Sequence, residues 1–294
     1  MDVAGLRART TERYQRRKAQ AIELVDRIPI LGRLLSDFVR IEFIDRCMLI
    51  AAQGLLALIP MLVVITAFFP DITANALDQF SATTGLGDSG TRVVQEELDP
   101  SQIRAQTGFI GLAITLFSAA SFARAIQRMY ERVWELPHIG GLSGTRRCLA
   151  WLIGWIVTVQ LIGGLRNLLG GSDALATDFI RVGVQVVIVS LIWWANCWLL
   201  LFGRVRWRKL ALGSILTGVL EVTYSHASGL VMPLYVESNS DQFGTLGVIL
   251  AISTWLIGFA GILVGSALVG RVVSEDPTVL RVVAGTQKVL LRRS

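Results

Sequence analysis

The sequence predicts an all-α protein, a polytopic bundle of six transmembrane helices with an additional amphipathic helix at its N-terminal end. Hydrophobic residues make up 53% of the 294 residues and charged residues only 17%, whereas charged residues are ~25% of an ordinary soluble domain. Six apolar stretches are long enough to cross about 30 Å of hydrocarbon, which takes about 20 helical residues. The basic residues alternate between the segments that connect these stretches. These three observations together favour a membrane protein.

The sequence divides into three regions. Residues 1–46 form a basic N-terminal region, residues 47–270 the membrane domain, and residues 271–294 a C-terminal tail. Because the helical pattern continues past Arg124 toward Trp134, we expect the second span to leave the membrane as a helix. The predicted spans lie near residues 47–69, 107–123, 148–169, 180–202, 210–232 and 243–270.

The distribution of Lys and Arg predicts the orientation. Of these residues, 24 fall in the N-terminal region, in 124–147, in 203–209 and in the tail, and 4 fall in the other three connections. The positive-inside rule predicts this alternation for six spans with both termini in the cytoplasm. We therefore expect a multi-pass protein of a bacterial plasma membrane, N-in and C-in. The basic residues then indicate topology and contact with anionic lipid headgroups, not a nucleic-acid surface.

Two segments outside the spans have distinctive patterns. In residues 13–42, Leu24, Ile28, Leu31, Leu35 and Phe38 recur at steps of three and four among basic residues, which is typical of an amphipathic helix. Such a helix would lie in the cytoplasmic interface, with membrane lipids as its partners, and packing against the ends of the bundle is compatible with the same pattern. The outer loop 70–106 is acidic and has a Gly/Ser/Thr-rich centre; loops of this length are often functional.

One acidic residue lies halfway along an otherwise apolar span. A charged group at the centre of a membrane helix costs about 2.5–3.5 kcal/mol on insertion scales, so Glu221 should face the bundle interior. It belongs to a polar stripe at helical spacing. One interpretation is a polar cavity with a substrate-facing or proton-titrating carboxylate; the other is a structural carboxyl that bonds to a neighbouring helix. The stripe comprises Ser214, Thr217, Gly218, Glu221, Ser225 and Ser228.

Glycines in and beside the last two spans are candidates for close packing or hinges. Gly261 and Gly265 have the GxxxG spacing that lets two helices approach closely. The full set is Gly213, Gly218, Gly244, Gly247, Gly261 and Gly265.

Signatures of an enzyme are scarce. The two histidines, His138 and His226, lack the spacing of a metal site, and the three cysteines are too far apart in sequence for a CxxC pair. Ser143 lacks the full GxSxG pattern of a nucleophile elbow. We therefore expect no catalytic residue, no metal site and no cofactor, and the oligomeric state stays open.

Four motifs in this order resemble the YihY/BrkB family of bacterial inner-membrane proteins. The resemblance covers roughly residues 35–272 and implies a six-span plasma-membrane protein that handles lipid-like or envelope molecules. It also implies importance for Gly213, Glu221, Gly244 and Gly247, which match recurrent positions. A ribonuclease label once used for the family has no support in these residues. The motifs are Ala51–Pro60, Ala125–Trp134, Arg208–Gly213 and Phe243–Gly247.

Two functions of different classes follow. The first is a transporter or flippase-like protein for a lipid or other amphiphilic envelope molecule, which the Glu221 stripe and the basic interfacial helix favour. The second is a membrane scaffold or envelope-assembly factor, whose acidic outer loop and basic N-terminal helix would bind partners. A membrane-embedded nuclease is disfavoured.

Overall fold

The fold is known from a computed structural model of the chain, which describes residues 29–68, 81, 84–86, 100–139 and 175–276. Within these residues there are six helices and no strand, which confirms the all-α prediction. The helices are α2 (Pro29–Arg40), α3 (Phe43–Phe68), α6 (Pro100–Val133), α8 (Leu175–Leu200), α9 (Trp207–Phe243) and α10 (Thr245–Glu275).

Several predicted features lie outside the described residues. They are residues 13–28 of the amphipathic helix, the third span at 148–169, most of the outer loop 70–106 and the tail beyond residue 276. The six-span topology and the cytoplasmic placement of both termini therefore stay predictions.

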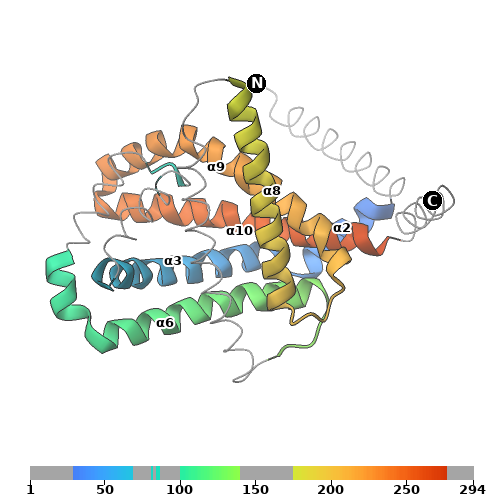
Figure 1. The fold of residues 1–294 in the computed structure, drawn as a ribbon, viewed down its shortest axis with the longest axis horizontal. Coiled ribbons are helices and arrows are strands. Elements are labelled where there is room, and N and C mark those ends of the chain that lie inside the picture. The colour runs from blue at the N-terminus through green and yellow to red at the C-terminus, as the bar shows by residue number, and fades with distance from the viewer. Residues whose placement is uncertain (1–28, 69–80, 82–83, 87–99, 140–174, 277–294) are drawn as a thin grey trace, which may run out of the picture. The chain divides into compact units, whose positions relative to one another are not determined.

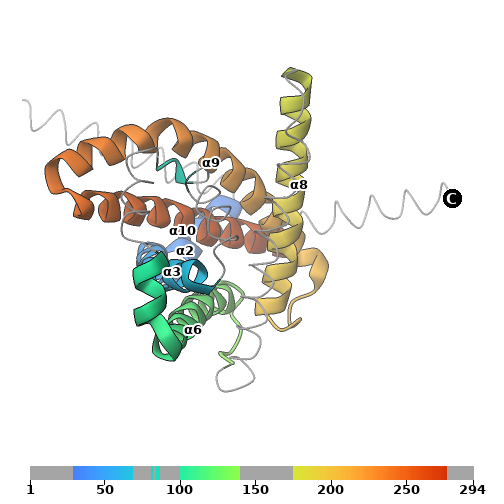
Figure 2. The same cartoon turned by 60° about the vertical axis from the view of Figure 1, so that its left-hand side comes forward.

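The chain divides into two compact units, residues 42–271 and residues 1–41 with 272–294. In the larger unit α3 packs along α6, and α8 packs against α9. Both views of the ribbon show α9 and α10 running side by side (Figure 1 and Figure 2). The helices directly before and after α9 in the chain thus cover the face of α9 that carries the polar stripe.

In the described part of the chain, two helices are both long and apolar enough to cross a membrane. They are Arg181–Leu200 within α8 and Thr245–Glu275, with mean hydropathies of 1.7 and 2.3. The criterion is one of length and composition, which the core helix of a soluble protein can also meet.

Helix α9 is longer than the predicted fifth span. The sequence places a connection after residue 232, but the helix continues through Pro233 to Phe243. It ends at Gly244, which has φ +59° and donates its backbone N–H to the Ser240 carbonyl oxygen (2.8 Å). Because only glycine adopts this conformation without strain, the break between α9 and α10 falls there.

In the smaller unit, residues 29–40 of the predicted amphipathic helix are helical. Leu31, Leu35 and Val39 are exposed along one side of α2. Arg33 pairs with Asp276 across a long sequence separation (Nη1 to Oδ2, 3.4 Å). This ion pair joins α2 to the end of α10 within the unit.

Candidate functional site

The predicted polar stripe of α9 faces neighbouring helices. Ser214, Thr217, Gly218 and Ser228 are buried, while Glu221 and Ser225 are half-buried. The structure therefore brings the stripe into the interior of the bundle, between α8 and α10.

Glu221 accepts a hydrogen bond from Trp193. The donor is the indole Nε1 of a side chain on α8 that is only 1% exposed, and the acceptor is the carboxylate Oε2. Because burial of a carboxylate is costly without a donor, this bond stabilises Glu221 where it lies. The indole partner was not predicted from the sequence.

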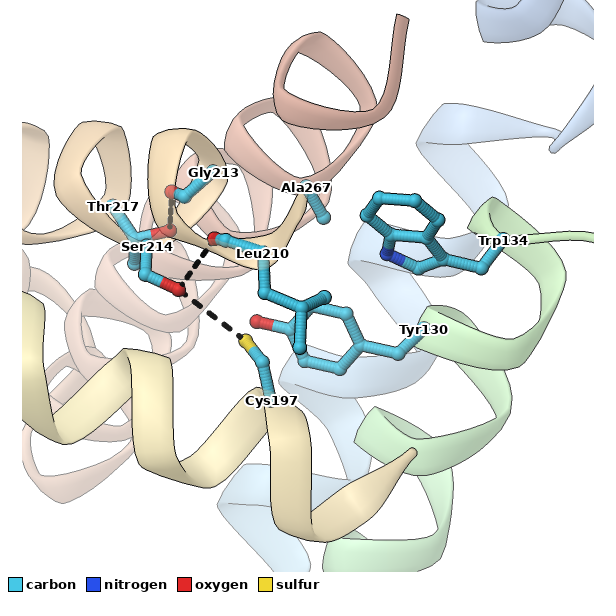
Figure 3. Close-up of a pocket in the computed structure, with 8 residues that line it drawn as sticks. All are labelled: Tyr130, Trp134, Cys197, Leu210, Gly213, Ser214, Thr217 and Ala267. Atoms are coloured by element: carbon cyan, nitrogen blue, oxygen red, sulfur yellow. Dashed lines mark hydrogen bonds between the residues drawn. The ribbon is translucent and has the colours of Figure 1, made fainter. Parts of the chain in front are cut away.

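The hydroxyl groups of the stripe on the first turns of α9 bond largely to their own helix. Ser214 Oγ donates to the Leu210 carbonyl oxygen (2.9 Å), and Thr217 Oγ1 donates to the Gly213 carbonyl oxygen (2.8 Å). Ser214 Oγ also lies 4.0 Å from the Cys197 sulfur on α8 (Figure 3).

A small cavity lies beside these hydroxyl groups, where α6, α8, α9 and α10 meet. Its volume is about 10 Å³, which is close to the ~10–15 Å³ that one water molecule requires. The described residues around it are therefore packed closely, with no space there for a lipid. Figure 3 shows its lining residues, which are Tyr130, Trp134, Cys197, Leu210, Gly213, Ser214, Thr217 and Ala267; Glu221 is not among them.

Aromatic side chains cover the other half of the stripe. Trp255 on α10 donates its indole N–H to Ser228 Oγ (3.1 Å), and Tyr224 donates its hydroxyl to the Trp255 carbonyl oxygen (3.1 Å). The rings of Trp255 and Phe259 stack at 5.5 Å, and Phe259 lies 6.2 Å from the Trp193 ring. A row of aromatic rings therefore extends from Ser228 to the indole that binds Glu221.

Several polar atoms in this interior have no partner among the described residues. They are Ser190 Oγ and Asn196 Nδ2 on α8 and Ser266 Oγ on α10. All three residues are more than nine-tenths buried. An unsatisfied buried polar group costs about 1–3 kcal/mol, so these three groups weaken the packed arrangement.

The predicted glycines differ in what surrounds them. A Cβ on Gly218 would meet Ser190, including its backbone nitrogen at 2.8 Å, and one on Gly213 would lie 3.2 Å from the Ser266 carbonyl oxygen. A Cβ on Gly247 would meet the backbone of Asn239, whereas one on Gly244 would have no neighbour within 4 Å in the described part of the chain.

The GxxxG pair on α10 has more space. Among the described residues a Cβ on Gly261 would have no neighbour within 4 Å, and one on Gly265 would reach only Phe43, at 3.8 Å. A close approach of α9 and α10 occurs instead where Gly213 faces Gly270.

A second polar cluster, centred on Glu131 near the end of α6, was not predicted. The Glu131 side chain is 3% exposed. Its Oε1 accepts from Arg204 Nη2 (2.6 Å), Gln127 Nε2 (3.0 Å) and the Ile139 backbone N–H (3.3 Å). Its Oε2 accepts from His138 Nδ1 (2.7 Å).

These donors decide the ionisation of Glu131. Burial raises the pKa of the carboxyl group, but the hydrogen bonds from Gln127, His138, Arg204 and the Ile139 N–H outweigh it, so the pKa is lower than its ordinary value of 4.5. Glu131 therefore stays ionised at neutral pH.

The Glu131 cluster connects three chain segments. Arg204 lies between α8 and α9, and its Nη1 also donates to the Pro137 carbonyl oxygen (2.7 Å). Nearby, Arg271 on α10 donates to the Val133 carbonyl oxygen (2.6 Å). Gln127 and Glu131 have a spacing of four residues, which places them on one face of a helix and was the available sequence signal. The partners from residues 137–139 and 204 become neighbours only through the fold.

An all-helical bundle with an interior polar stripe, in which two of the described helices are long and apolar enough to span a bilayer, is compatible with a helical membrane protein. The family described as Virulence factor BrkB matches residues 43–283, and the chain belongs to this family. Membership indicates an integral membrane protein, with which the two apolar helices are compatible. Comparisons with curated proteins and with solved structures found no match.

Proposed function

We propose that this protein moves a lipid or another amphiphilic envelope molecule across the membrane. The observation that carries the proposal is Glu221, a carboxylate on an apolar helix that faces α8 and receives a hydrogen bond from Trp193. Acidic groups within membrane helices are costly and typically serve a pathway for polar groups. Movement of this kind requires no covalent chemistry, so we propose a carrier and not an enzyme.

The polar atoms without described partners support the same proposal. Ser190 and Asn196 lie on α8 and Ser266 on α10. Ser190 faces Gly218 and Ser266 faces Gly213 on α9, and the small cavity beside the stripe has room for about one water molecule. In a carrier, separation of α8 and α9 would expose these groups to the polar part of a cargo. The packed arrangement would then be the occluded state, and the polar atoms would gain partners on opening.

A translocation assay tests the proposal. The full chain is reconstituted into vesicles with a fluorescent phospholipid, and the fraction of label accessible to an external quencher is followed over time. We expect Glu221→Ala to slow the exchange of label between leaflets at least about tenfold, a change in barrier of about 1.4 kcal/mol. The matched control is Thr223→Ala, because Thr223 lies on the exposed side of the same helix.

Two results would count against transport. One is a wild-type protein that is as inert as Glu221→Ala with every lipid and amphiphile tried. The other is equal exchange by the wild type and by Glu221→Ala, which would return Glu221 to a structural role.

The close packing around the stripe favours a second candidate, a membrane scaffold or envelope-assembly factor. The cavity of about 10 Å³ and the bond from Trp193 to Glu221 are what a rigid scaffold needs. Crosslinking in intact cells followed by purification should then recover the same stable partner with wild type and Glu221→Ala. Recovery of no stable partner would weaken this candidate.

A further inference from the structure

The turn between α8 and α9 carries a concentration of positive charge. Arg204, Arg206, Arg208 and Lys209 lie within six residues, and no acidic residue occurs between Asp178 and Glu221. Arg206 and Arg208 are exposed. In the part of the chain that the structure describes, neither side chain has a hydrogen-bond or ion-pair partner. Two guanidinium groups are therefore available to an anion.

The turn itself is fixed in place by Arg204. Besides Glu131 and Pro137, its guanidinium bonds to the Leu201 carbonyl oxygen within the turn (Nε, 3.1 Å). Its charge is already paired with Glu131. Arg204 thus holds the backbone that leads to Arg206, and the turn is ordered before any ligand arrives.

An exposed tryptophan lies between the two available arginines in the sequence. The Trp207 ring lies 4.5 Å from that of Trp194 and 5.9 Å from that of Trp198, and Trp194 Nε1 donates to the Trp207 carbonyl oxygen (2.9 Å). Trp207 is 44% exposed and Trp198 43%. Tryptophan is enriched at the level of lipid headgroups because its ring is apolar and its N–H polar.

Apolar side chains continue from this cluster along both helices. On α9, Leu212 and Ile215 are exposed, and on α8 so are Val187 and Leu191. Leu191 and Val187 precede Trp198 by seven and eleven residues, which places all three on one face of the helix. A ligand that is anionic at one end and has hydrocarbon chains at the other fits this order of residues.

We propose that the α8–α9 turn binds the headgroup of an anionic phospholipid, with Arg206 and Arg208 on the phosphate and the acyl chains along the exposed apolar faces of α8 and α9. Guanidinium groups match phosphate oxygens in geometry and charge. The Lys and Arg distribution places this turn on the cytoplasmic side, where anionic lipids gather. The exposed apolar residues distinguish the site from one for a soluble phosphate. The site is independent of transport, since a bound lipid need not be moved.

Lipid titration of the purified full chain tests the proposal. Native mass spectrometry counts bound phosphatidylglycerol and, separately, phosphatidylcholine of the same acyl chains. With ~1 kcal/mol per basic residue, R206Q/R208Q should weaken phosphatidylglycerol binding about 30-fold. Binding of phosphatidylcholine should not change. The control R124Q/R128Q also removes two cations, from α6, and should bind phosphatidylglycerol as the wild type does.

Three outcomes would overturn the proposal. The first is equal phosphatidylglycerol affinity of the wild type and R206Q/R208Q. The second is an equal loss of phosphatidylglycerol affinity in R124Q/R128Q, which would show that binding depends on the total charge of the protein and not on this turn. The third is displacement of phosphatidylglycerol by glycerol phosphate or a short RNA at similar concentration, which would indicate a site for soluble phosphates.

Discussion

Glu131 and Glu221 are both buried or half-buried carboxylates, but their surroundings differ. Glu131 accepts hydrogen bonds from three side chains and one backbone N–H, whereas among the described residues Glu221 accepts a side-chain hydrogen bond from one indole. A carboxylate with several donors is a stable structural centre, and one with a single donor can exchange that partner at lower cost. We therefore assign Glu131 a structural role, in which it stabilises the packing of the helices.

The substitution Glu131→Gln should destabilise the protein by on the order of 3 kcal/mol at neutral pH, because Arg204 loses its buried partner. The lowered pKa of Glu131 sets the pH dependence: its stabilisation is fully present above about 4.5 and is lost as the pH falls through the lower value of the folded state. Thermal unfolding in detergent, followed by tryptophan fluorescence, should show the two proteins converging in acid.

Glu42→Gln is the matched control for this measurement. Glu42 pairs with Arg46 (3.3 Å) but its side chain is 53% exposed, so its loss should cost at most about 1 kcal/mol. Equal losses for both substitutions, or a difference between wild type and Glu131→Gln that grows in acid, would refute the role given to Glu131.

Of these two carboxylates, the sequence alone singled out Glu221 and not Glu131. Glu221 stands out because a charge within an apolar stretch is visible in the sequence alone. Glu131 lies in a stretch that contains several charges, and its one sequence signal is the four-residue spacing from Gln127, which does not predict burial. Its burial depends on Arg204 and His138, which the fold brings to it from other segments.

At the scale of helices, hydropathy predicts where apolar helices lie better than it predicts where those helices end. The fifth span is predicted to end near residue 232, just before Pro233. Helix continues to Phe243 because a proline removes only one backbone donor, and Gly244 supplies the actual stop. The third span and residues 13–28 lie outside the described residues, so those predictions stay open.

Contacts between helices were the feature that the sequence predicted least well. The GxxxG rule points to Gly261 and Gly265, but which glycine meets a neighbour depends on the rotation of each helix about its axis. In the structure Gly218 faces Ser190, and Gly213 faces Gly270. Such pairings join residues far apart in the chain, and periodicity within one helix does not reveal them.

Substitution by alanine should distinguish a glycine in close contact with a neighbouring helix, such as Gly218, from one with space around it, such as Gly261. Alanine at position 218 would place a methyl group 2.8–2.9 Å from the backbone of Ser190, so α8 and α9 must move apart, at a cost of about 1–3 kcal/mol. Gly261→Ala is the control and should be neutral or stabilising by up to about 1 kcal/mol, since alanine favours helix. The unfolding temperatures of both variants in detergent measure the effect; a Gly218→Ala protein as stable as Gly261→Ala would contradict this packing.

At the scale of the whole molecule, the topology is the main open prediction. Fusions of alkaline phosphatase, which is active only outside the cytoplasm, should be active after residue 90 and inactive after residues 139 and 294. Fusions of green fluorescent protein at the same positions should give the opposite pattern. A phosphatase that is active at residue 294 would exclude six spans with both termini inside.

The length of α6 has a mechanical consequence. At ~1.5 Å per residue, its 34 residues would extend roughly 50 Å in a straight helix, but the first turns bend away from the rest (Figure 1). The remaining part of α6 packs along α3, and its last turns are anchored by Glu131 to the α8–α9 turn. A displacement of that turn would therefore be transmitted along this part of α6 to the residues that contact α3.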